Sequence, residues 1–273
     1  MLRQVPLFRV AAIVMLLAMV AIDALAQTGR ADLARARTAY NARDFDTAIA
    51  AATAARTAGE TADAGAIVLA RALLERYRER ADPADLSAAR QVLGTVRTSL
   101  LDERDRIELL LAMGEALFLE DDFGAAAEVL ESGLWRAAID PELAESMLEW
   151  WGSAIERQAS AAAPEDRKKH FARLAERMKT ALLKRPSSPA ASYWMVVALR
   201  GTGELDRAWD AAVAAWVRAR LAGDRSPSLR ADVDRLVLKG IIPDRVAHIA
   251  QDQRGAAESQ LRAEWELVKE RWK

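Results

Sequence analysis

Residues 109–134 read LLLAMGEALFLEDDFGAAAEVLESGL, and this stretch decides the fold class. Before the acidic turn at 120–122, apolar and small residues recur at the period of an amphipathic helix. They are Leu110, Met113, Gly114 and Leu117. After the turn the same spacing begins again at Phe123 and continues through Ala126. Gly inside a helix costs roughly 1 kcal/mol relative to Ala, so we expect Gly114 to mark a close crossing of two helices, about 8 Å apart, opposite Ala126.

The same order of residues recurs along the chain: a small residue, a large anchor nine positions later and an Ala or similar residue three positions after that. The anchors are Phe45, Leu86, Phe123, Phe171 and Leu205. This order resembles the tetratricopeptide repeat, a helix-turn-helix unit of about 34 residues. The polar stretches at 75–85 and 160–169 account for the longer spacings as extended turns.

The resemblance implies an all-α protein, a right-handed solenoid of helical hairpins over residues 27–224 with a C-terminal helical cap over 225–273. An unrelated helical bundle is the alternative, because amphipathic stripes occur on any surface helix. Pro residues that follow a capping side chain predict helix starts. These pairs are Asp82-Pro83, Asp140-Pro141, Ser188-Pro189 and Ser226-Pro227. The last of these helices should end at Gly240, and Ile241, Ile242 and Pro243 should turn the chain.

A final helix is predicted over residues 252–273. Its apolar residues form one stripe on an otherwise charged helix: Leu261, Trp265, Val268 and Trp272. A solenoid leaves the apolar face of its last unit bare, so we expect this stripe to cover that face in a monomer. The alternative is a coiled-coil dimer through residues 258–273, although the stripe has barely two heptads.

The N-terminus is typical of a secretory signal peptide. Arg3 and Arg9 precede the apolar segment Val10–Ile22, and Ala24 and Ala26 form a small-x-small cleavage site. The segment is shorter than the roughly 20 residues that span a bilayer. We therefore expect cleavage after Ala26, no stable membrane span afterwards, and a bacterial periplasmic or secreted protein. An uncleaved N-terminal membrane anchor is the alternative.

Composition argues against several classes of function. The formal net charge of -1 gives no long-range field for nucleic acid or an anionic membrane. The chain has no Cys, and its two His residues, His170 and His248, have no second ligand at metal-site spacing. We therefore expect a non-enzymatic protein without cofactor or metal.

Repeat stacking produces a concave surface, and in the family the first helix of each hairpin faces it. The resemblance therefore assigns partner contacts to residues on those helices: Arg37, Tyr40, Asn41, Glu115, Phe118, Glu149, Glu156, Tyr193 and Arg200. These residues do not reproduce the Lys/Asn clamp that some family members use for a terminal carboxylate.

Two functions are consistent with this surface. The first is an interaction or scaffold protein that binds a protein or peptide in the concave groove. The second is a periplasmic small-ligand carrier similar to the tetratricopeptide component associated with tripartite solute transporters. A deep pocket lined by Trp150, Tyr193 or Trp194 would favour the carrier, and an open groove would favour the scaffold. Most of the eight Trp residues should pack in the core.

Overall fold

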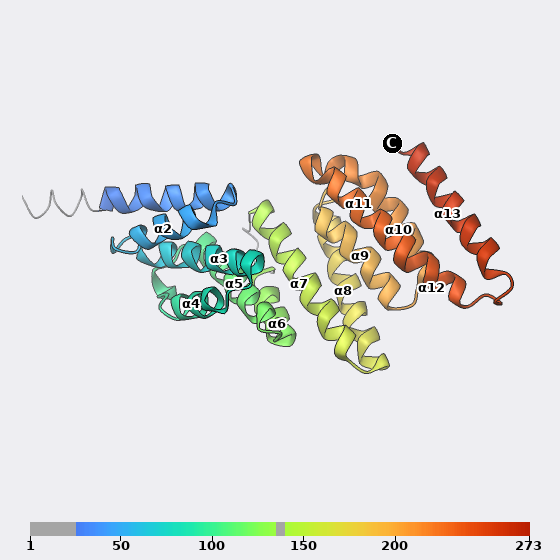
Figure 1. The fold of residues 1–273 in the computed structure, drawn as a ribbon, viewed down its shortest axis with the longest axis horizontal. Helices are drawn as coiled ribbons and strands as arrows, with labels where there is room; N and C mark the ends of the chain where they lie inside the picture. The colour runs from blue at the N-terminus through green and yellow to red at the C-terminus, as the bar shows by residue number, and fades with distance from the viewer. Residues whose placement is uncertain (1–25, 135–139) are drawn as a thin grey trace, which may run out of the picture. The chain divides into compact units, whose positions relative to one another are not determined.

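The computed structural model describes residues 26–134 and 140–273. In these residues the regular elements are helices and no strand occurs, which confirms the all-α prediction (Figure 1). Residues 1–25, which carry nearly all of the predicted signal peptide, lie outside this range. The chain divides into two compact units, unit 1 up to Glu120 and unit 2 from Asp121. The domain boundary predicted near residue 225 falls within unit 2.

Unit 1 contains a helix over residues 26–41 and four further α-helices. These are α2 (Phe45–Ala55), α3 (Ala62–Arg80), α4 (Pro83–Leu93) and α5 (Glu103–Leu119), with a short 3-10 turn at Thr98–Leu100. Helix α3 contacts α2, α4 and α5. Small residues dominate the core between them, with Ala36, Ala51, Ala52, Ala70 and Ala89 all fully or almost fully buried. Methyl side chains allow helices to approach closely, so this core is thin and the helices lie near one another.

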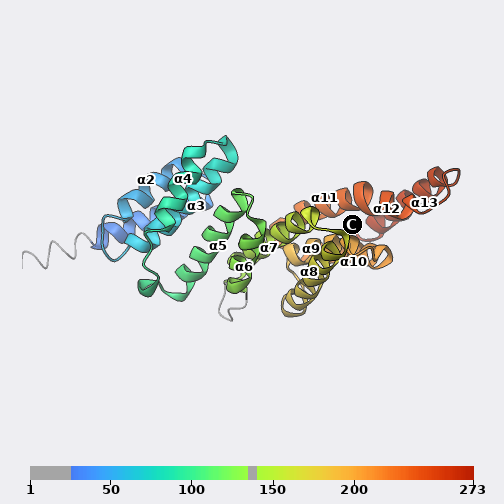
Figure 2. The same cartoon turned by 90° about the horizontal axis from the view of Figure 1, so that it is seen from below.

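Unit 2 is also built from successive α-helices (Figure 1 and Figure 2). Its helices are α6 (Phe123–Leu134), α7 (Pro141–Ala161), α8 (Pro164–Lys184), α9 (Pro189–Gly201), α10 (Leu205–Arg218), α11 (Ser226–Leu236), α12 (Ile242–Ala247) and α13 (Arg254–Arg271). Consecutive helices from α6 to α11 pack on one another, and α7 also contacts α9, as α9 contacts α11. Helices α7, α9 and α11 therefore form one layer, and α8 and α10 lie against it in a second.

The repeat anchors fall on alternate helices. Phe45, Phe123 and Leu205 are the first residues of α2, α6 and α10, whereas Leu86 and Phe171 lie within α4 and α8. Helix α5 differs from its prediction, because Met113 was expected to face inward and is 40% exposed. Helices α5 and α6 lie on either side of the division between the units, so the close crossing at Gly114 and Ala126 stays a prediction.

Three of the four predicted helix starts are confirmed. The side chains of Asp82, Asp140 and Ser188 each accept a hydrogen bond from a backbone N–H in the first turn, directly before a Pro. The fourth cap was wrong, because Ser226 is already the first residue of α11 and Arg225 occupies the cap position without a side-chain bond.

The predicted stop at Gly240 was also wrong. The chain stays helical from α11 through a π-helical turn at Val237–Ile241 into α12. Pro243 lacks an N–H, and it lies two residues after the π-helical turn, where the regular α-helical hydrogen-bond ladder is already interrupted. Gly240 has a different role. A Cβ there would lie 2.9 to 3.0 Å from the Arg200 guanidinium, so the Gly allows that side chain to lie against the helix.

The apolar stripe of α13 is covered within the chain except at its end, where Trp272 is 40% exposed. Trp265 is fully buried, and Leu261 and Val268 pack against the core formed by α9, α10, α11 and α12. The Trp265 ring packs edge-on against the rings of Trp209 and Trp216, with distances of 5.8 and 5.6 Å between the ring centres. Its indole N–H donates to Asp234 at 2.8 Å. Helix α13 thus closes the end of unit 2.

None of the described helices is both long enough and apolar enough to cross a bilayer.

Candidate functional site

The nine residues predicted to contact a partner divide between the two units. Arg37, Tyr40 and Asn41 lie on the 26–41 helix and Glu115 and Phe118 on α5, all in unit 1. Glu149 and Glu156 lie on α7, and Tyr193 and Arg200 on α9, in unit 2. The two sets are in very different environments.

In unit 1 the predicted residues Arg37, Tyr40 and Glu115 are held or buried within the unit, whereas Asn41 is exposed. Arg37 forms an ion pair with Asp105 of α5 at 2.7 Å. The Arg71 guanidinium of α3 lies 4.7 Å from the centre of the Tyr40 ring. Burial raises the pKa of the Tyr40 hydroxyl well above its usual range. Glu115 is only 2% exposed. These contacts join the first helix to α3 and α5, so the side chains stabilise the unit from inside.

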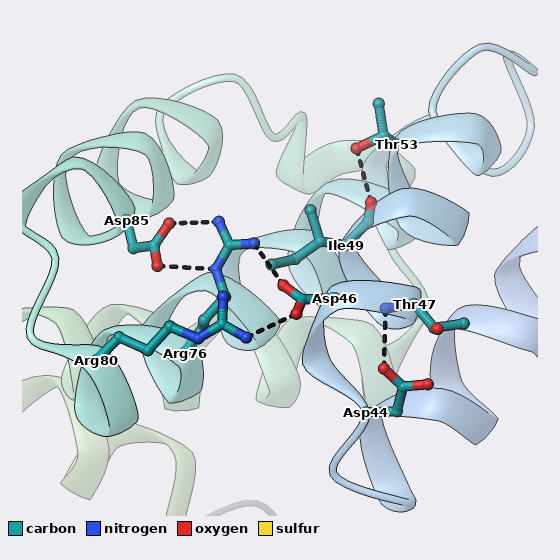
Figure 3. A network of polar contacts seen from close by, with 8 residues as sticks. All are labelled: Asp44, Asp46, Thr47, Ile49, Thr53, Arg76, Arg80 and Asp85. Atoms are coloured by element: carbon teal, nitrogen blue, oxygen red, sulfur yellow. Dashed lines mark hydrogen bonds and ion pairs between the residues drawn. The ribbon is translucent and has the colours of Figure 1, made fainter.

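A second charge network joins the outer helices of unit 1 (Figure 3). Arg76 of α3 donates two hydrogen bonds to the buried Asp85 of α4, at 2.8 and 2.6 Å, and a third to Asp46 of α2 at 2.8 Å. Arg80 also pairs with Asp46, at 2.6 Å. The bonds from Arg80 and Arg76 hold the pKa of the Asp46 carboxyl below its usual range. One arginine therefore links three helices and satisfies a buried carboxylate.

In unit 2 the four predicted residues line two hollows. The first, the Glu149 hollow, has a volume of about 200 Å³ and is lined by Glu149, Tyr193, Arg225, Leu229 and Asp232 among others. The second, the Glu156 hollow, has a volume of about 360 Å³ and is lined by Glu156, Arg167, Phe171, Val197, Arg200 and Asp244 among others.

The two hollows follow one another along one face. Glu149 and Glu156 are seven residues apart on α7, as are Tyr193 and Arg200 on α9. Seven residues are about two helical turns, or about 10.5 Å, so each pair repeats on the same side of its helix. The sequence prediction therefore brings together four residues that do share a surface.

Most charged groups of the Glu156 hollow are held by partners. Arg200 donates to Asp244 at 2.7 Å. Arg167 donates to the carbonyl oxygens of Ala159 and Ala162 at the end of α7. Among the described residues, no Lys, Arg or His nitrogen lies within 4.0 Å of a Glu156 carboxylate oxygen, so Glu156 forms no ion pair. Burial raises the pKa of the Glu156 carboxyl, and the charges of Arg200 and Arg157 offset only part of that shift.

The Glu149 hollow has a similar balance. Asp232 pairs with Arg235 at 3.1 Å. Burial raises the pKa of Glu149. The indole N–H of the buried Trp194 offsets part of this rise in pKa, although its geometry is not that of a hydrogen bond. Burial, together with the charges of Glu156, Asp232 and Glu149, raises the pKa of Tyr193 to about 12. Tyr193 is therefore a neutral hydroxyl at physiological pH, able to donate and accept a hydrogen bond.

Four charged residues that line these hollows were not predicted as partner contacts: Arg167, Arg225, Asp232 and Asp244. The last three lie at or beyond residue 225, in the segment interpreted as a cap. An acidic residue on an amphipathic helix gives no signal of its own, because the same pattern occurs on any solvated face. In the described part of the chain no three His, Asp or Glu side chains are grouped as metal ligands would be.

The chain matches no protein-family model, no curated protein and no solved structure.

Proposed function

We propose that this chain is an exported, non-enzymatic protein of tetratricopeptide-like hairpins that binds a protein or peptide partner across the layer of α7, α9 and α11. The observation that carries the proposal is the pair of successive polar hollows on that layer, each lined by residues of neighbouring helices. A surface that repeats every two helical turns suits an extended partner, which can contact both hollows at once.

The placement of the anchors supports the repeat interpretation. All five lie on the second helix of their predicted hairpin, and Gly201 at the end of α9 meets the ring of Phe171, so that a Cβ at this position would overlap the ring. The resemblance itself rests on the order of a small residue, an anchor nine positions later and an Ala or similar residue three positions after that. On this proposal the first helices of the hairpins form the binding layer.

The alternative of a small-ligand carrier has less support. Of the three rings named for a carrier pocket, Tyr193 lines the Glu149 hollow, whereas Trp194 is 4% exposed and neither Trp194 nor Trp150 lines either hollow. The two hollows are lined largely by charged and polar side chains. An apolar ligand site would need the rings at its surface.

The signal-like sequence of the N-terminus favours a partner among the proteins of the bacterial envelope or its surroundings. The proposal is tested by affinity capture from an envelope extract, with the wild-type chain and a Tyr193→Glu variant as baits. Tyr193 lines a hollow and is partly exposed, so the added charge should disturb the face without opening the core.

A Leu183→Glu bait is the control, because Leu183 on α8 is 79% exposed and lies outside both hollows. We expect one captured partner that is lost with Tyr193→Glu and kept with Leu183→Glu. Capture by all three baits would contradict the assigned face, and no specific capture by the wild type would contradict the proposed function.

A further inference from the structure

The carboxylates of the two hollows differ in whether the chain neutralises them. Asp244 pairs with Arg200 and Asp232 with Arg235. Among the described residues, no cation lies within ion-pair distance of Glu149 or Glu156. Glu156 is half-buried and Glu149 is exposed, and both lie on the same side of α7, so this face presents two negative charges in register that the chain does not neutralise.

The nearby arginines are not free to turn toward Glu156. The Arg200 guanidinium is bonded to Asp244 and lies against Gly240, where even a methyl group would be too close. Arg167 is held by two carbonyl oxygens at the end of α7. Both cations of this hollow are therefore committed within the chain, and the Glu156 carboxylate stays available to a cation from outside.

In the Glu149 hollow, Arg225 is the one lining cation and it is exposed. Its charge lowers the pKa of Glu149 by less than burial raises it, and the two groups form no ion pair. A cationic ligand group that pairs with Glu149 would therefore break no ion pair within the chain. Tyr193 lines the same hollow as Glu149 and is partly exposed, so its hydroxyl is available to donate or accept a hydrogen bond.

The spacing selects the shape of the ligand. Two turns of α7 separate the glutamates by about 10.5 Å along the helix axis. A polyproline-II segment rises about 3.1 Å per residue and returns to the same side every three residues, so positions three apart lie about 9 Å from each other. Long, flexible Lys or Arg side chains can cover the remaining distance.

We propose that Glu149 and Glu156 bind two basic side chains, three positions apart, of an extended peptide segment in the partner, with Tyr193 contacting the segment between them. This inference rests on the proposed function and adds the chemistry of the partner. Arg is the better match, because its planar guanidinium can pair with a carboxylate through two hydrogen bonds.

The test uses the full chain, as the cell processes it, and a fluorescent proline-rich peptide carrying two Arg residues three positions apart. Matched peptides carry Gln or Glu at both positions. Anisotropy titrations at low and high salt should rank the affinities Arg above Gln above Glu, with the difference shrinking in salt. Glu149→Gln and Glu156→Gln should each weaken the Arg peptide about threefold and the double variant about tenfold.

Glu176→Gln is the matched control, because Glu176 on α8 is 77% exposed and outside both hollows. Equal affinity for the three peptides, an unchanged double variant, or an equal loss in Glu176→Gln would overturn the inference. If the envelope partner captured by the wild type is also captured by the double variant, the basic-segment inference fails and the proposed function stands. Absence of any specific partner in that capture removes the proposed function as well.

Discussion

Unit 1 and unit 2 are built from similar helices but use charge and aromatic rings in opposite ways. Unit 1 packs small Ala residues and ties its helices together with arginines, such as Arg76 between Asp46 and Asp85. All eight Trp residues of the sequence belong to unit 2, where Trp151, Trp194 and Trp265 fill the core. Large rings contribute to the apolar core of unit 2, whereas the core of unit 1 consists mainly of Ala and aliphatic side chains.

The difference teaches where a binding surface can arise. In unit 1 the residues predicted to contact a partner, Arg37 and Tyr40, already contact Asp105 and Arg71. In unit 2 the equivalent layer leaves Glu149 and Glu156 without an internal cation. A surface whose charges are satisfied within the unit has little left to offer a ligand, so we assign binding to unit 2.

The largest expected effect comes from removing a central ring of unit 2. Trp265→Ala deletes a fully buried side chain and leaves the Asp234 carboxylate without its indole donor. The free energy of unfolding should fall by about 3 to 5 kcal/mol. Urea unfolding followed by Trp fluorescence reports unit 2 alone, because unit 1 contains no Trp.

Trp272→Ala is the control for that variant, since Trp272 is 40% exposed on the same helix. Its cost should be below about 1 kcal/mol. Equal destabilisation by the two variants would mean that α13 does not close unit 2 through Trp265.

In unit 1 the largest effect should come from an arginine. Arg76→Ala removes both bonds to Asp85, whose side chain is 7% exposed, and leaves a buried carboxylate unsatisfied. We expect a loss of about 2 kcal/mol in the unfolding of unit 1, measured by circular dichroism and absent from the Trp signal.

The neighbouring Arg80→Ala removes only an exposed pair, with 54% and 57% of the two side chains accessible, and should cost less than about 0.5 kcal/mol. A loss as large as that of Arg76→Ala would show that the network of Figure 3 does not depend on the buried bond.

The sequence was informative wherever one local rule dominated. The helix starts at Asp82, Asp140 and Ser188 were predictable, because a capping oxygen before Pro satisfies the first turn whatever the tertiary structure. The stop at Gly240 was not, because that Gly serves a tertiary contact with Arg200 while the π-turn carries the helix on.

Only the residues that α7 and α9 contribute to the candidate site were predicted from the sequence. Glu149, Glu156, Tyr193 and Arg200 were predicted because the tetratricopeptide resemblance puts the first helix of each hairpin on the binding surface. Asp244 and Arg225 approach from later helices, and no local pattern connects them to α7. Whether Glu156 is neutralised depends on where Arg200 points, which is decided by Gly240 and Asp244 together.

A smaller effect is expected at the contact between α8 and α9. Gly201→Ala places a methyl group into the ring of Phe171 and should cost about 1 to 3 kcal/mol through overpacking. Gly255→Ala on α13 meets no atom within 4 Å and should be neutral or slightly stabilising. Thermal unfolding of the two variants compares them directly, and equal midpoints would contradict the close contact of Gly201 with Phe171.

The smallest expected effect is the pH dependence of stability that comes from the Glu156 carboxylate, which has no ion-pair partner. The folded state raises the pKa of Glu156 above its ordinary value of 4.5, so ionisation of this group opposes folding. This loss of stability is absent when the pH is below the ordinary pKa, and it develops as the pH rises from the ordinary pKa through the higher pKa of the folded state. Glu156→Gln should therefore stabilise unit 2 by roughly 0.5 kcal/mol at pH 7, a figure reduced for solvent screening, and by nothing at low pH. An advantage that is constant with pH would exclude this origin.

The central claim is that the layer of α7, α9 and α11 in unit 2 is the surface that meets a partner. Site-specific photo-crosslinking in the envelope tests it most directly, with a photoreactive residue replacing Tyr193 in the Glu149 hollow or Asp210 on the exposed side of α10. The account predicts one specific crosslinked product from position 193 and none from position 210. A product from position 210, with none from position 193, would contradict it.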